Sequence, residues 1–196
     1  MIGRRRAGLA CVTTSLLLLS FAGSRYAAGA VSAERAREAW DAQAAARAVA
    51  AARASASSAA APEPLVDGAP VAHLVIPKIG LDQIVLEGVD GDDLNAGPGH
   101  VPGSALPGER GNAVVSAHRD RHFSHFGDLA VGDTIVTESN GHRDVWSIVA
   151  RKVIDKDAPA LFHTPDATLT LTTCWPIRYF GTAPERLIFT AKPIRF

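Results

Sequence analysis

The larger, C-terminal part of the chain carries the hydrophobic pattern of a β protein. From Leu65 onward, short runs of β-branched and apolar residues alternate with turns rich in Gly and Pro. The segment Thr168–Thr172 alternates strictly between Thr and Leu, as a strand with one buried face does. We predict seven strands in this part of the chain: Ala72–Ile76, Gln83–Leu86, Asn112–Ala117, Thr134–Glu138, Asp144–Ile154, Thr168–Thr173 and Leu187–Ala191.

The segments between these strands predict connections with little regular structure. Gly97–Gly103 contains three Gly and two Pro and is expected to be a loop, whereas Ser124–Leu129 is expected to hold a helical turn. Seven or eight strands in about 130 residues favour a small closed barrel or a sandwich, so the fold class is all-β.

The first residues show the pattern of a membrane or export segment. Three arginines, Arg4 to Arg6, precede an uncharged stretch of 18 residues, Ala7–Ser24, and Arg25 ends it. Eighteen helical residues just span a bilayer, and small residues near Ala27–Ala30 would also suit a cleavage site. Position, charge and length favour a membrane span or a signal sequence over a buried core helix, and the charge distribution predicts a cytoplasmic N-terminus.

An Ala-rich segment connects the two parts. Residues 31–61 contain 16 Ala and neither Gly nor Pro, and their charged residues are scattered around every helical face. Such a helix has little to bury and is expected to be a stalk, with a disordered linker equally open beyond Ala50. We therefore divide the chain into an anchor segment (1–30), a helical stalk or linker (31–64) and a β domain (65–196).

Charge and cysteine content exclude several classes of function. The 20 basic and 20 acidic residues balance, although residues 1–61 carry +5 and residues 62–196 carry −5. This balance argues against a nucleic-acid partner bound through bulk charge. Two cysteines, Cys11 and Cys174, exclude a disulfide-rich scaffold and a four-cysteine zinc site, and Cys174 has no close ligand pair for another metal site.

Candidate chemistry lies at the ends of three predicted strands. Cys174 is the single cysteine of the β domain, and a thiolate nucleophile needs a base or an imidazolium beside it. His118 follows another strand and is a candidate for that role. Arg186 enters the last strand and could stabilise negative charge on a carbonyl oxygen. Residue types alone leave open a buried structural cysteine and a surface arginine, and the domain contains six other histidines that we expect to be mostly solvated: His73, His100, His122, His125, His142 and His163.

These residues lie in motifs that resemble the sortase family of cysteine transpeptidases. Thr170–Cys174 matches the family signature TLxTC, which ends in the nucleophile. The stretch from Leu94 to Arg119, with GPGH, PG and GNAVVSAHR, is similar to the approach to the family's catalytic histidine, and Gly132-Asp133-Thr134-Ile135 resembles a turn before its next strand. The resemblance covers roughly residues 70–196.

The resemblance implies a fold and a set of roles. It implies an eight-stranded β-barrel with His118, Cys174 and Arg186 in one groove, supported by Thr173 and by the backbone at Ala117, where many relatives carry Gly. It also implies a thioacyl-enzyme on Cys174, a protein substrate with a C-terminal LPxTG-like sorting signal, and an amine acceptor. Some sortases have a calcium site, but the clustered acids that it needs cannot be placed in this sequence, and we expect neither metal nor cofactor.

Further features resemble the proteobacterial sortases called class GN. These are Cys174-Trp175-Pro176, the short interval between Cys174 and Arg186, and the N-terminal anchor. They imply a single-pass protein of the inner membrane whose catalytic domain lies in the periplasm. The alternatives left open are a barrel that only hydrolyses its substrate and an anchored, non-catalytic barrel that binds peptides or scaffolds an envelope complex.

Overall fold

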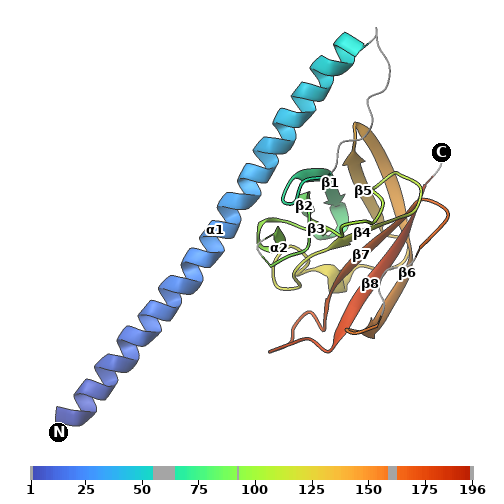
Figure 1. Ribbon diagram of the computed structural model, residues 1–196. Coiled ribbons are helices and arrows are strands. Elements are labelled where there is room, and N and C mark those ends of the chain that lie inside the picture. Colours follow the sequence, from blue (N-terminus) through green and yellow to red (C-terminus); the bar gives the residue numbers. More distant parts are fainter. Residues whose placement is uncertain (1, 55–64, 92, 159–162, 195–196) are drawn as a thin grey trace.

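The computed structural model describes residues 2–54, 65–91, 93–158 and 163–194. A long helix is followed by eight strands, with short helices between some of them (Figure 1). In chain order the elements are α1 (Ile2–Ala54), β1 (Pro70–Ile76), η1 (Pro77–Ile79), β2 (Leu81–Glu87), α2 (Asp93–Ala96), β3 (Gly99–His100), β4 (Asn112–Ser116), η2 (Phe126–Asp128), β5 (Thr134–Ser139), β6 (His142–Asp155), β7 (Thr168–Trp175) and β8 (Glu185–Pro193).

The eight strands close into a barrel in the order β1-β2-β3-β4-β7-β8-β6-β5, and β5 pairs with β1 to complete it. The pairs β2–β3 and β4–β7 are parallel, and the others are antiparallel. Closure removes the exposed edges that an open sheet would present. The predicted all-β barrel is confirmed, each of the seven predicted strands overlaps an observed one, and the helical turn expected at Ser124–Leu129 is η2.

Side chains that alternate along the strands fill the barrel. Leu169 and Leu171 of β7 are fully buried, and so are Leu187 and Phe189 of β8. The residues between them lie on the outer face of the barrel, because successive side chains point to opposite sides. Burying a side chain of this size stabilises the fold by about 1.5–3 kcal/mol. The buried indole of Trp146 donates a hydrogen bond to Thr137 Oγ1 (2.8 Å), which satisfies its polar edge.

The loop expected at Gly97–Gly103 contains a strand instead. Gly99 and His100 form β3, between β2 and β4. A Cβ at Gly99 would clash with the carbonyl oxygen of Gly88, so only glycine lets the two chain segments approach this closely. A Cβ at Gly97 would likewise lie 2.7 Å from the Ile84 carbonyl oxygen, so two of the glycines that predicted a loop permit close packing beside β2.

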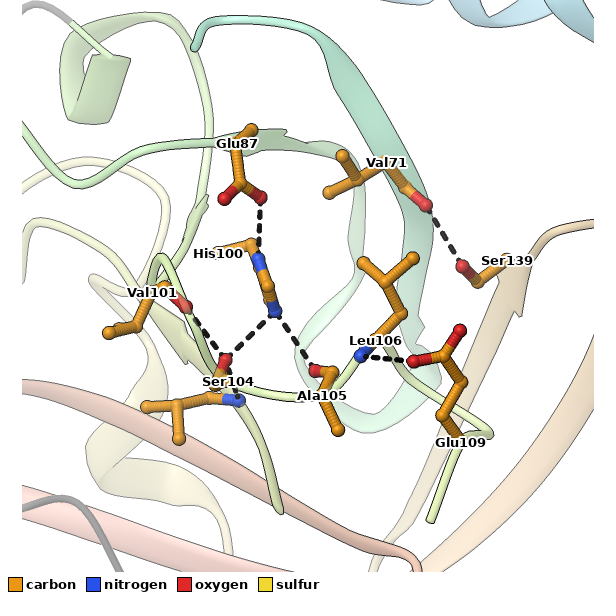
Figure 2. Close-up of polar contacts among 10 residues, drawn as sticks. Val71, Glu87, His100, Val101, Ser104, Ala105, Leu106, Glu109 and Ser139 are labelled. Carbon is orange, nitrogen blue, oxygen red and sulfur yellow. Dashed lines mark hydrogen bonds and ion pairs between the residues drawn. The ribbon is translucent and has the colours of Figure 1, made fainter. Parts of the chain in front are cut away.

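His100 is also buried, contrary to the expectation for the additional histidines. Its Nδ1 lies 2.6 Å from Glu87 Oε2, and its Nε2 lies 2.9 Å from the Ala105 carbonyl and 2.8 Å from Ser104 Oγ (Figure 2). Both ring nitrogens thus have partners inside the protein, and a buried polar group is tolerated when it is hydrogen-bonded. This network connects β2 and β3 to the loop before β4.

Helix α1 runs without interruption from Ile2 to Ala54, so the expected division near residue 30 falls inside one helix. The expected stalk is helical at least to Ala54, and residues 55–64 lie outside the described residues. The segment Thr14–Arg47 is long and apolar enough to cross a membrane, and 6% of its most apolar window is buried. A signal sequence would satisfy the same criteria of length and composition.

The expectation that this helix buries little is wrong along one face. Ala36 and Trp40, one turn apart on α1, are buried against a small cluster of Ile84, Leu86 and Ala96. Beside them, Arg37 Nη2 donates to Asp82 Oδ1 (2.9 Å) and to the Asp82 carbonyl (3.1 Å). In Figure 1, α1 accordingly lies beside β2 and α2, while its N-terminal half projects beyond the barrel.

Candidate active site

Strand β7 carries Cys174 near its end, on the outer face of the barrel. Leu169, Leu171 and Thr173 alternate on the inner face and are buried. Cys174 therefore points outward, and it is partly exposed. A thiol at this position is reachable from solvent yet mounted on a central strand of the barrel.

Arg186 lies directly opposite Cys174. The antiparallel ladder between β7 and β8 pairs these two residues, and it pairs inward-facing Thr173 with inward-facing Leu187. Directly opposed residues of antiparallel strands have Cβ atoms about 4.5–5.5 Å apart. The register thus places the guanidinium-bearing side chain beside the thiol on the same outer face.

His118 reaches the same face from the other side. The parallel ladder between β4 and β7 has a constant offset, which pairs Ser116 with Thr172, and the hydrogen bond from the Ala117 N–H to the Thr172 carbonyl (3.2 Å) continues it. Two residues beyond Ser116, the same offset brings His118 level with Cys174. Three adjacent strand ends, β4, β7 and β8, thereby collect the three residues that the sequence predicted.

A pocket of ≈ 260 Å³ lies at these strand ends. It is smaller than three other cavities of the described structure, of ≈ 460, ≈ 530 and ≈ 780 Å³, which lie elsewhere on the molecule. The strand ends and loops that form its wall supply both charged and small residues: His118, Arg119, Asp120, Lys156, Cys174, Gly181, Thr182, Ala183 and Arg186.

Thr173 and Ala117 fix the distance between β4 and β7 beneath the pocket. The buried Thr173 Oγ1 donates to the Ala117 carbonyl (2.7 Å). Ala117 packs in the barrel core, next to His118 in sequence. These two residues therefore lie behind the pocket wall, and neither side chain lines the pocket.

Arg119 is a site residue that the sequence reasoning did not single out. Its guanidinium donates to three backbone carbonyls of the β7–β8 loop, those of Pro176 (3.1 Å), Tyr179 (3.1 Å) and Gly181 (2.7 Å), and lies 5.6 Å from the Tyr179 ring centroid. It ties the segment after β4 to the loop that walls the pocket. Its position directly after His118 was the available signal, but its partners are more than 50 residues away along the chain.

The remaining candidates lie away from this pocket. Arg178 lies between Cys174 and Arg186 in the sequence and could in principle supply the same guanidinium. It is exposed and does not line this pocket. His122 lines the ≈ 530 Å³ cavity instead, where burial lowers its pKa below 6.5 despite a hydrogen bond to the Asn95 backbone. Among the described residues, no group of three or more His, Cys, Asp or Glu is arranged to hold a metal ion.

Comparison with known proteins identifies relatives with this barrel. A family profile described as sortase domain matches residues 74–194. Sortase D of Bacillus subtilis (strain 168) is 39% identical over 124 residues, which cover 62% of this chain and 62% of that protein. The chain thus matches less than two thirds of the length of this relative.

Solved structures give the same result. A Clostridium perfringens sortase D5 transpeptidase is 28% identical with a TM-score of 0.61, covering 67% of this chain and 83% of that one. Sortase C1 of Streptococcus agalactiae is 30% identical with a TM-score of 0.60, covering 65% and 68%. The barrel, its strand-end pocket and the family profile agree: the chain belongs to the sortase family.

Proposed function

We propose that this protein is a membrane-anchored cysteine transpeptidase that uses His118, Cys174 and Arg186. The observation that carries the proposal is the register of β4, β7 and β8, which collects these three residues on one outer face and in one pocket. The relatives named above support the reaction class, and one of them is itself described as a transpeptidase.

In the first half-reaction, the Cys174 thiolate attacks a peptide carbonyl of the sorting motif and forms a carbon–sulfur bond. The tetrahedral intermediate collapses as the carbon–nitrogen bond breaks, and the His118 imidazolium gives its proton to the leaving amine. The product is a thioester on Cys174 and a neutral His118.

In the second half-reaction, an amine of the acceptor attacks the thioester. Neutral His118 takes the proton from the attacking nitrogen, the carbon–sulfur bond breaks, and the thiolate and imidazolium are restored.

Arg186 holds the oxyanion or the substrate backbone. Its side chain lies on the β8 side of the thiol, so the carbonyl under attack lies between the guanidinium and the imidazole. Thr173 and the carbonyl of Ala117 keep β4 and β7 at a fixed separation, and they act by positioning the reacting groups.

We infer the substrate and location from the motifs and from α1. The substrate is a protein with a C-terminal LPxTG-like signal, and the acceptor is an amine at the cell envelope. Helix α1 anchors the protein in the inner membrane as a single pass, with its N-terminus in the cytoplasm and the barrel in the periplasm. The motif after Cys174 supports membership of class GN.

Mass spectrometry of the full chain incubated with an LPxTG-type peptide tests the proposal. We expect an acyl adduct on Cys174, release of the peptide's C-terminal fragment, and a ligated product when an amine is added. Cys174→Ala should give none of these with its fold intact, and His118→Ala should lose nearly as much turnover.

Two outcomes would favour the alternatives. An adduct that only water resolves, whatever amine is supplied, would identify a hydrolase. Peptide binding without any adduct, together with indifference to Cys174→Ala, would identify a scaffold.

A further inference from the structure

We propose that the catalytic end of the barrel is held against the surface of a lipid bilayer, with Tyr179 and Phe180 of the β7–β8 loop forming a second point of contact beside α1. This inference rests on the proposed membrane anchoring of α1. It adds an orientation, because it states which face of the barrel meets the lipid.

The first observation is where α1 leaves the barrel. The Tyr26 ring lies 5.3 Å from the guanidinium of Arg121, and a Cβ at Gly29 would lie 2.7 Å from the Asn95 carbonyl oxygen and would clash with the Arg121 side chain. Arg121 belongs to the turn that begins at His118, since its N–H donates to the His118 carbonyl (3.3 Å). The residues of α1 before Tyr26 therefore leave the barrel at its catalytic end.

The second observation is the short interval between this contact and the apolar stretch. The uncharged segment Ala7–Ser24 ends two residues before Tyr26 and five before Gly29. At about 1.5 Å of rise per residue, five residues span roughly 7.5 Å. A bilayer that surrounds Ala7–Ser24 therefore lies close to the catalytic end, and α1 does not hold that end away from it.

The third observation is an exposed aromatic pair on the neighbouring loop. Phe180 is fully exposed (104%) and Tyr179 is 48% exposed, and they lie between the ends of β7 and β8. In Figure 1 this connection points to the same side of the barrel as the N-terminal half of α1. Aromatic rings are favoured at the interface between headgroups and hydrocarbon, where their apolar surface leaves water.

The backbone of the β7–β8 loop is already ordered before it contacts a lipid surface. The three hydrogen bonds from Arg119 fix its backbone, so ordering it at a surface costs little conformational entropy. Between Pro176 and Pro184 the single charged residue is Arg178, which suits phosphate headgroups. Acidic residues at the same end, Asp120 and Asp128, are balanced by Arg119, Lys156 and Arg186, so a zwitterionic surface is sufficient for the contact.

A bilayer fits these observations better than a protein partner because the apolar helix and the aromatic tip lie at the same end. Gly181, Thr182 and Ala183 of the same loop line the pocket of Cys174. The pocket therefore opens beside the lipid surface, where a peptide bond close to a membrane segment would meet it.

Photo-crosslinking of the full chain in phosphatidylcholine vesicles tests the orientation. A p-benzoyl-phenylalanine replaces Phe180, or Tyr179 as a second variant, and lipid adducts are measured by mass spectrometry of the labelled peptide. The control position is His142, which is exposed at the start of β6, at the opposite end of the barrel from Arg186. A second control is Leu17, inside the apolar stretch.

We expect lipid adducts at positions 17 and 180, severalfold above position 142. Adducts at 17 but at neither 179 nor 180 would overturn the inference and leave the anchor intact. Equal adducts at 180 and 142 would also overturn it, since they would show non-specific adsorption. Absence of adducts at 17 would remove the anchor, and the orientation with it.

Discussion

Adjacent residues of β7 have opposite functions because their side chains point to opposite faces. Thr173 is buried and ties β7 to β4 through the Ala117 carbonyl, whereas Cys174 faces the pocket. Arg186 and Leu187 divide in the same way on β8. At this scale, a slip of one residue in register would bury the thiol and expose the core.

We expect Arg186→Lys to lose at least ~10-fold in transpeptidation, about 1.4 kcal/mol in transition-state stabilisation. A planar guanidinium can contact a peptide carbonyl and a developing oxyanion together, and an ammonium on a flexible stem cannot fix that geometry. Thermal stability should change little. Steady-state kinetics with an LPxTG-type peptide measure the loss.

Arg178→Lys is the matched control, because Arg178 is exposed and lies outside the pocket. Its turnover should equal that of the wild type. If Arg178→Lys were crippled and Arg186→Lys normal, the assignment of the third catalytic residue would be wrong.

We expect His100→Leu to lower the free energy of unfolding by about 3–5 kcal/mol, because the buried Glu87 carboxylate loses its partner. The double variant His100→Leu/Glu87→Leu should cost less than the sum of the single variants, since no unpaired charge remains. Urea denaturation measures all three. Strict additivity of the two effects would show that the pair is not coupled.

At the scale of elements, two contacts dock α1 on the barrel, a polar cluster and an apolar patch. The polar cluster centres on Asp82, whose pKa is held below 3.8 by hydrogen bonds from His73 and Arg37. The patch is formed by Ala36 and Trp40 against the cluster on β2 and α2. Together they hold α1 against β2 and α2.

We expect Gly29→Val to separate this part of α1 from the barrel, because the new side chain would meet the Asn95 carbonyl and the Arg121 side chain. Amide exchange of α2 and of residues 118–125 should become faster, as measured by mass spectrometry. Gly23→Val is the control, since nothing lies within 4 Å of a Cβ at that position. Equal exchange in the two variants would contradict the close approach at Gly29.

The cavity beside α1 predicts a pH dependence. Burial lowers the pKa of His122 below 6.5, so the unfolded chain binds a proton there at a pH where the folded chain does not. The free energy of unfolding should therefore fall as the pH decreases through 6.5. In urea denaturation at pH 7.5 and 5.5, His122→Gln should show a smaller decrease than the wild type, and an unchanged decrease would assign the effect to other groups.

At the scale of the whole molecule, one helix combines a candidate membrane span with a surface that packs on the barrel. Its N-terminal part has the length and composition of a membrane span, and its middle packs on β2 and α2. Cleavage after the small residues near Ala30 would remove Tyr26 and Gly29, and with them the contacts to Arg121. Retention of the helix is therefore coupled to the orientation of the catalytic end.

We expect residues 7–24 to remain in the mature protein. N-terminal sequencing of protein purified from membranes decides this, because a retained anchor leaves the sequence before Ala7 in place. A start near Ala30 or Val31 would refute the anchor and identify a cleaved signal sequence.

Much of the fold follows from local patterns. The alternation in Thr168–Thr172 and the Gly and Pro turns predicted seven of the eight strands. The strand Gly99–His100 escaped prediction because it is two residues long and is defined by its neighbours β2 and β4. The burial of His100 escaped for the same reason, as its partner Glu87 lies on another strand.

The sequence by itself determined the all-β domain, the long Ala-rich helix, and Cys174, His118 and Arg186 as candidates for chemistry, because periodicity, propensity and motifs are local properties of the chain. Only the tertiary structure decided that these three residues share one face, that Arg119 fixes the β7–β8 loop, and that α1 docks at the end of the barrel that carries His118. Each of these depends on strand register or on a contact between segments distant in the chain. Such contacts are set by how the whole molecule packs, which no local pattern encodes.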